Sequence, residues 1–154
     1  MTKIIPYLWF DKGKAKEAAD FYILIFKDAK ILSEFAIENT PSGTVTEITI
    51  EIKGQKMIFL DVGPEFKFTE AISFMIDCAD QNEVDYYWEK LTSDGGSEGQ
   101  CAWLKDKFGL SWQVVPKQFY ELTKKDSSGK VMEEMLKMNK IIIKDLEKVF
   151  KENN

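Results

Sequence analysis

The chain has 154 residues, 44% of them apolar, which is enough for one hydrophobic core and typical of a globular protein. Its net charge of −5 comes from 26 acidic residues against 21 basic ones, and every basic residue is lysine. Without arginine or a basic stripe, the composition argues against a nucleic-acid partner. No apolar run is long enough to span a bilayer, and polar residues follow the first apolar ones too soon for a signal peptide, so we expect a cytoplasmic protein with no membrane partner.

Histidine is absent from the sequence. This removes the usual general base near neutral pH and the commonest imidazole metal ligand, which excludes Ser-His-Asp, Cys-His and histidine–metal sites. Chemistry through carboxylates, lysine, thiols, tyrosine or the backbone stays open, as does binding without catalysis. Cys78 and Cys101 are expected to remain free thiols, because a chain of this size can build a core without a disulfide.

The N-terminal part of the chain predicts a strand, a helix and three further strands. An apolar, β-rich run at 3–10 predicts the first strand, and apolar residues at helical spacing from Lys14 predict an amphipathic helix. Strands are expected at 30–37, 44–52 and 56–62, with turns between the last three. Isoleucines alternate with polar residues in the second of these, so one face of that strand belongs in the core.

The same pattern restarts in the second half of the chain. The predicted elements are a strand at 71–77, a helix capped by Asp80 or Asn82, short strands within 97–106 and a strand at 112–115. Gly109 can close the turn before the last strand at no steric cost, and Pro116 ends that strand.

Two βαβββ patterns in tandem predict an internally duplicated α+β fold, because each sheet has one apolar face that needs cover. We assign residues 1–65 to the first module, 66–118 to the second and 119–154 to a C-terminal helical extension of one compact domain. In the extension, a polar linker at 124–130 precedes apolar residues at helical spacing, which leaves one long helix or two short ones.

Several separated segments carry a family resemblance. They are residues 8–11, 17–22, 66–74, 84–91 and 100–116. In this order they resemble the PhnB-like family, a branch of the vicinal oxygen chelate superfamily that includes glyoxalase I and bleomycin-resistance proteins. The resemblance implies two βαβββ modules whose curved mixed sheets enclose a cleft, often in a homodimer. Members are often labelled demethylubiquinone methyltransferase, but this chain has no glycine-rich loop after a strand of the kind a Rossmann methyltransferase uses.

Metal-dependent members of that superfamily hold a divalent ion with histidine and glutamate side chains from both modules. By resemblance, one of these positions falls at Gln113 and a second falls near Asp61. A third falls at Ala71, which follows Glu70. An amide oxygen can bind a metal but brings no charge, so it binds more weakly than a carboxylate. One carboxylate and one amide do not make a tight site, and we expect neither a metal nor another cofactor.

Large rings and polar side chains crowd the 100–116 segment, a mixture typical of a pocket wall. The residues expected to line the cleft are Trp9, Phe59, Asp61, Cys101, Trp103, Lys105, Trp112 and Gln113. For the tryptophans the simpler interpretation is core packing. Asp106 is most simply a turn former, and Gln113 and Asp61 could instead satisfy each other as a buried polar pair. The Cys101 thiol has no histidine to activate it as a nucleophile and is expected to be catalytically inert.

Three hypotheses for the function follow. The first is a metal-independent protein that binds a small molecule of unknown identity. The second is an enzyme, either a glyoxalase-like lyase or isomerase with a degenerate metal site or one that uses Asp61 and Lys105. The third is an interaction module whose C-terminal helices dock on a partner. The sequence assigns no catalytic residue.

Overall fold

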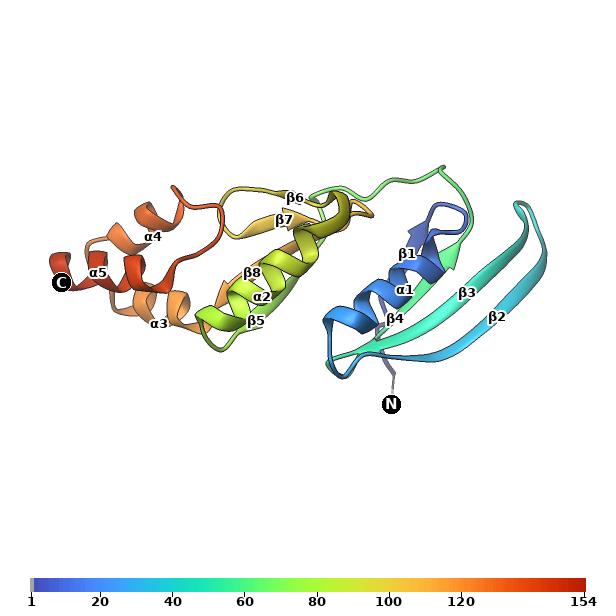
Figure 1. The fold of residues 1–154 in the computed structure, drawn as a ribbon, viewed down its shortest axis with the longest axis horizontal. Helices are drawn as coiled ribbons and strands as arrows, with labels where there is room; N and C mark the ends of the chain where they lie inside the picture. Colours follow the sequence, from blue (N-terminus) through green and yellow to red (C-terminus); the bar gives the residue numbers. More distant parts are fainter. Residues whose placement is uncertain (1) are drawn as a thin grey trace. The chain divides into compact units, whose positions relative to one another are not determined.

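The computed structural model describes residues 2–154, which fall into two compact units, the chain up to Lys67 and Phe68–Asn154. The elements of the first unit are β1 (Tyr7–Phe10), α1 (Lys14–Ile25), β2 (Lys30–Thr40), β3 (Gly43–Ile52) and β4 (Gln55–Asp61) (Figure 1). The first strand is shorter than predicted and begins only after Pro6, which has no backbone N–H to donate to a neighbouring strand.

The first sheet has the strand order β1-β4-β3-β2, with β1 parallel to β4 and the other pairs antiparallel. The alternation predicted for β3 is confirmed, because Ile48, Ile50 and Ile52 are all buried. They share the face of the sheet on which α1 lies (Figure 1). A two-residue turn at Lys53 and Gly54, both with positive φ, joins β3 to β4.

The second unit repeats this arrangement. Its first elements are β5 (Ser73–Cys78), α2 (Gln81–Thr92), a 3₁₀ turn at Ser93–Gly95, β6 (Ser97–Glu98), β7 (Trp103–Lys105) and β8 (Ser111–Pro116). Asp80 caps α2, and its Oδ1 accepts a hydrogen bond of 3.0 Å from the Glu83 N–H. The strand order β5-β8-β7-β6 matches that of the first unit element for element. The predicted duplication of a βαβββ module in an α+β fold is therefore confirmed.

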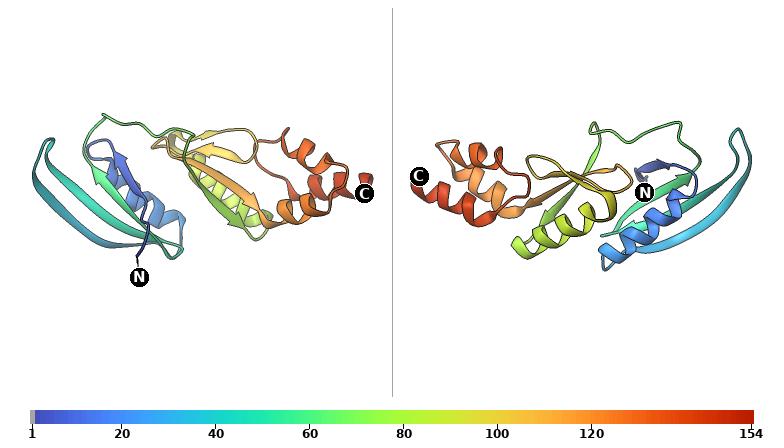
Figure 2. Two further views of the ribbon diagram at one scale, coloured as in Figure 1. Left: turned by 180° about the vertical axis from the view of Figure 1, so that it is seen from behind. Right: turned by 45° about the horizontal axis from the view of Figure 1, so that its top comes forward.

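Three helices follow β8, namely α3 (Lys117–Lys125), α4 (Lys130–Met135) and α5 (Ile143–Asn153). The sequence predicted the linker and left open one or two helices after it; the structure has two. It did not predict α3, a short helix in which only Phe119 is buried. The helices gather at one end of the second unit (Figure 2) and share a buried cluster of Ala102, Val115, Phe119, Val131, Ile141 and Leu146. The extension thus packs on the second module, and the predicted division at 118/119 falls inside α3.

No helix of residues 2–154 has the length and apolar character needed to cross a membrane.

The two thiols are free, as predicted, but differ in burial. Cys78 is 0% exposed. Its burial is the main cause that raises the pKa of its thiol to about 12, and the neighbouring carboxylates of Glu83, Asp77 and Asp80 raise it further. Cys101 is only half-buried.

We expect an aromatic disulfide reagent at about pH 8 to label Cys101 in the native protein and to leave Cys78 unlabelled until the protein is denatured, because the thiolate is the reacting form. Absorbance of the released chromophore counts the labelled thiols. A Cys101→Ser variant supplies the control: rapid native labelling of that variant would show that Cys78 is accessible.

Candidate functional site

Asp106 organises the turn between β7 and β8. Its side chain is 2% exposed, and Oδ1 accepts hydrogen bonds from the backbone N–H groups of Phe108 (2.9 Å) and Leu110 (3.1 Å). Its Oδ2 accepts one of 2.8 Å from Trp112 Nε1. Gly109 closes the turn with a φ of 83°. The interpretation of Asp106 as a turn former is confirmed, and the same carboxylate also fixes the indole of Trp112.

The turn sets a register that divides the second sheet into two faces. Cross-strand partners point to the same side of a sheet, and β7 pairs with β8 through Trp103 with Gln113 and Lys105 with Ser111. The other face carries Leu104 and Trp112, both buried, on the side where α2 packs. We call the first side the polar face; it consists of Ser73, Met75, Trp103, Lys105, Ser111 and Gln113.

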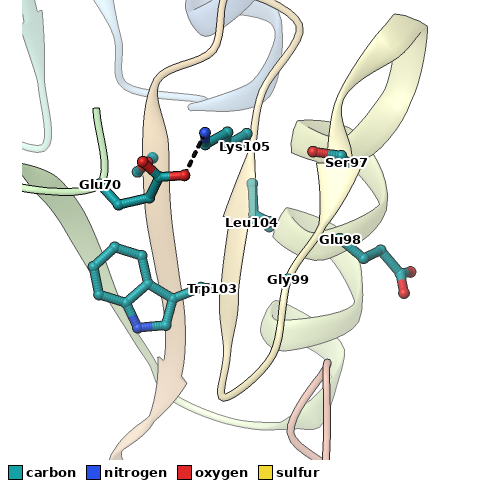
Figure 3. A pocket seen from close by; sticks show the side chains of 8 residues that line it. Glu70, Ser97, Glu98, Gly99, Trp103, Leu104 and Lys105 are labelled. Carbon is teal, nitrogen blue, oxygen red and sulfur yellow. Dashed lines mark ion pairs between the residues drawn. The ribbon is translucent and has the colours of Figure 1, made fainter. Parts of the chain in front are cut away.

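A hollow of about 280 Å³ opens on the polar face (Figure 3). It is lined by Glu70, Ser97, Glu98, Gly99, Trp103, Leu104, Lys105 and Ser111, all from the second unit. Only glycine fits at position 99, because a Cβ there would lie 2.9 Å from the carbonyl oxygen of Trp103. Its N–H donates a hydrogen bond of 2.8 Å to that oxygen and keeps this wall beside β7. We call this hollow the polar-face pocket.

One ion pair lies in the polar-face pocket. The Lys105 ammonium is 2.5 Å from the Glu70 carboxylate (Figure 3), and this hydrogen bond is the main cause that lowers the pKa of Glu70. The Glu98 carboxylate is turned elsewhere, since it accepts hydrogen bonds from Trp88 Nε1 (2.8 Å) and Asn139 Nδ2 (3.4 Å). Lys105 and Glu70 are therefore the charged side chains that meet within the pocket.

Ser111, one of the residues that line the pocket, carries a buried hydroxyl. The residue is 1% exposed, and its Oγ has no hydrogen-bond partner among residues 2–154. Buried polar side chains nearly always have a partner, so the Ser111 hydroxyl is one of the few groups here with a hydrogen bond still to make. Ser111 was not among the cleft residues predicted from the sequence. The available signal was its position opposite Lys105 across the five-residue turn at 106–110.

The predicted cleft residues of the second unit separate between the two faces. Trp103, Lys105 and Gln113 lie together on the polar face, where Gln113 Nε2 donates to Ser73 Oγ at 2.9 Å. Trp112 is 3% exposed on the opposite face. Cys101 lies in the loop before β7, with its sulfur 3.9 Å from the Leu136 carbonyl oxygen.

The predicted cleft residues of the first unit have partners within that unit. Phe59 is 0% exposed and packs in the core under α1. Asp61 Oδ1 accepts a hydrogen bond of 2.6 Å from the Gly13 N–H, just before α1. Trp9 Nε1 donates to the Gly63 carbonyl oxygen at 2.7 Å, and its ring meets Phe66 edge-on.

Asp61 and Gln113 each have a hydrogen-bond partner within their own unit, Gly13 and Ser73; that they satisfy each other stays a prediction. That the predicted residues line one ligand cleft between the modules stays a prediction.

Residues 2–115 match the model of the family described as 3-demethylubiquinone-9 3-methyltransferase. The chain belongs to this family. Among solved structures, the PhnB protein from Bacillus cereus is 32% identical to it, with a TM-score of 0.64 over 75% of this chain and 99% of that chain. The predicted PhnB-like resemblance is thus confirmed. No curated protein matches the chain.

Two solved structures of lower sequence identity share the fold of this family member. A glyoxalase family protein from Bacillus cereus is 10% identical, with a TM-score of 0.54 over 75% of this chain and 94% of that chain. The fosfomycin resistance protein FosX from Listeria monocytogenes is 14% identical, with a TM-score of 0.52 over 78% and 94%. The chain thus shares its fold with a glyoxalase family protein and a fosfomycin resistance protein, as the resemblance implied.

In this family member, the side chains at the predicted metal positions do not fit a divalent ion. Gln113 offers only an uncharged amide, whose nitrogen donates to Ser73 Oγ, and the Glu70 carboxylate is held by a lysine ammonium. Ala71 has no donor side chain, and the Asp61 carboxylate accepts from the backbone before α1. Within residues 2–154, no three histidine, cysteine, aspartate or glutamate side chains are grouped so that they could hold a metal.

Proposed function

We propose that this protein binds a small molecule in the polar-face pocket without the help of a divalent metal. The observation that carries the proposal is the polar-face pocket itself, whose lining includes Ser111, a residue with a buried hydroxyl that has no partner among the described residues. Ligand sites combine apolar and aromatic walls with a few directed polar groups, here Trp103, Leu104 and the Lys105–Glu70 pair. A volume of about 280 Å³ suits a compact ligand.

The other functions have less support. Lys105 is held by a carboxylate and is therefore a poor free base for a lyase or isomerase. Methyl transfer is not proposed, because each sheet is mixed and has one helix of its module packed on it, unlike the parallel, doubly covered sheet of a Rossmann methyltransferase. The C-terminal helices bury Val131 and Leu146 within their own unit, which leaves less apolar surface for docking. The homodimer and the cytoplasmic location expected from the sequence remain part of our proposal.

The test is a ligand-observed NMR screen with single-ring fluorinated compounds against protein treated with a chelator. We expect binding to survive the chelator and to weaken by about tenfold or more in a Trp103→Leu variant, because an aromatic wall is lost. Phe35→Leu is the matched control, since Phe35 carries an exposed ring in the first unit and does not line the pocket. Binding that disappears with the chelator, or that weakens equally in both variants, would contradict the proposal.

A further inference from the structure

We infer that the ligand class of the polar-face pocket is an aromatic carboxylate, with its anionic group on Lys105 and Ser111 and its ring against Trp103. This inference rests on the proposed small-molecule binding and adds the chemical class. The three residues come from one patch, because Trp103 and Lys105 are alternate residues of β7 and Ser111 is the cross-strand partner of Lys105.

Lys105 supplies the charge for such a ligand. Its present partner, Glu70, has a side chain that is 65% exposed, whereas the Lys105 side chain is 38% exposed. An ion pair at this exposure contributes little to stability, so a carboxylate from a ligand can replace Glu70 at small cost. Glu70 belongs to no strand or helix, since β5 begins only at Ser73. Glu70 thus occupies the place that a ligand carboxylate would take.

Ser111 supplies the second contact. A hydroxyl donates one hydrogen bond, and a bond to a carboxylate is stronger than one to a neutral acceptor. Because the Ser111 Oγ is buried and without a partner among residues 2–154, a carboxylate bound at Lys105 would complete its hydrogen bonding. A ligand cation would instead meet the Lys105 ammonium and is disfavoured.

Trp103 supplies a surface for the ring. Its indole is half-buried and lines the pocket, so part of the aromatic surface is available for stacking. The second acidic side chain of the lining, Glu98, is engaged by Trp88 and Asn139, which reduces its repulsion of an anion. A single ring with one carboxylate suits a space of about 280 Å³.

The experiment compares benzoate with neutral benzamide by ligand-observed NMR titration on the full chain. We expect Lys105→Met to weaken benzoate binding about tenfold or more and Ser111→Ala to weaken it several-fold, because each loses a contact to the anion. Glu70→Gln should instead strengthen benzoate binding several-fold, because it removes the competing carboxylate. Benzamide affinity should change less than about twofold in Lys105→Met and Glu70→Gln, since it carries no charge.

The Glu70→Gln variant separates a binding effect from a folding effect, since a misfolded protein would not bind more tightly. Lys107→Met is the matched control, because Lys107 lies in the adjacent turn near the Phe108 ring and does not line the pocket. If benzamide binds as well as benzoate and Glu70→Gln changes neither, the carboxylate inference is overturned while the proposed function stands. If no single-ring compound binds, both are overturned.

Discussion

Replacing Asp106 with alanine is expected to lower the free energy of unfolding by about 3–4 kcal/mol, because one buried carboxylate satisfies three donors. Two of these donors, the Leu110 N–H and the Trp112 indole N–H, belong to residues that are only 2% and 3% exposed. Water cannot replace the lost acceptor there without opening the turn between β7 and β8. Urea denaturation followed by circular dichroism measures the change.

Two further variants test this explanation. Asp106→Asn keeps the shape and one acceptor oxygen but turns an NH₂ group toward a donor, so we expect an intermediate loss of about 2 kcal/mol. Trp112→Phe removes one donor and leaves the two backbone bonds of Asp106, so a smaller loss of about 1 kcal/mol is expected from the missing hydrogen bond. A loss below about 1 kcal/mol in Asp106→Ala would show that the turn does not depend on this carboxylate.

The elements that the sequence predicted well are those with a local cause. The isoleucines of β3 repeat with a period of two, Asp80 caps a helix and Gly109 closes a turn, and each signal lies within a few residues. Helix α3 is short and buries only Phe119, and that residue packs in a cluster built from segments far apart in the sequence, which no local signal shows.

The candidate site was only partly predictable, because periodicity shows which residues share a face but not which face a helix covers. Trp103 and Trp112 carry the same side chain and lie on neighbouring strands, yet one lines the pocket and the other packs in the core. The difference comes from α2, which packs on the face of Trp112. Ser111 was missed for a related reason: its importance follows from its register with Lys105, which depends on the length of the Asp106 turn.

Phe59 provides the sharpest test of this distinction, since it was predicted to line the ligand cleft but is 0% exposed in the core of the first unit. Its ring lies 4.8 Å from that of Phe10 and 5.8 Å from that of Tyr22, measured between ring centroids. Phe59→Ala should therefore lower the free energy of unfolding by about 3–5 kcal/mol, through lost burial and the cavity left behind.

Phe59→Leu is the matched control, because it keeps most of the apolar volume and should cost well under half as much, about 1–1.5 kcal/mol. Urea denaturation measures both variants, and NMR titration with benzoate measures binding by Phe59→Leu. If Phe59 only packs, benzoate affinity stays unchanged, because the lining of the polar-face pocket comes entirely from the second unit. If Phe59→Leu is as stable as the unmodified protein yet binds benzoate about tenfold more weakly, Phe59 contacts the ligand, and the site includes the first unit as the family resemblance implies.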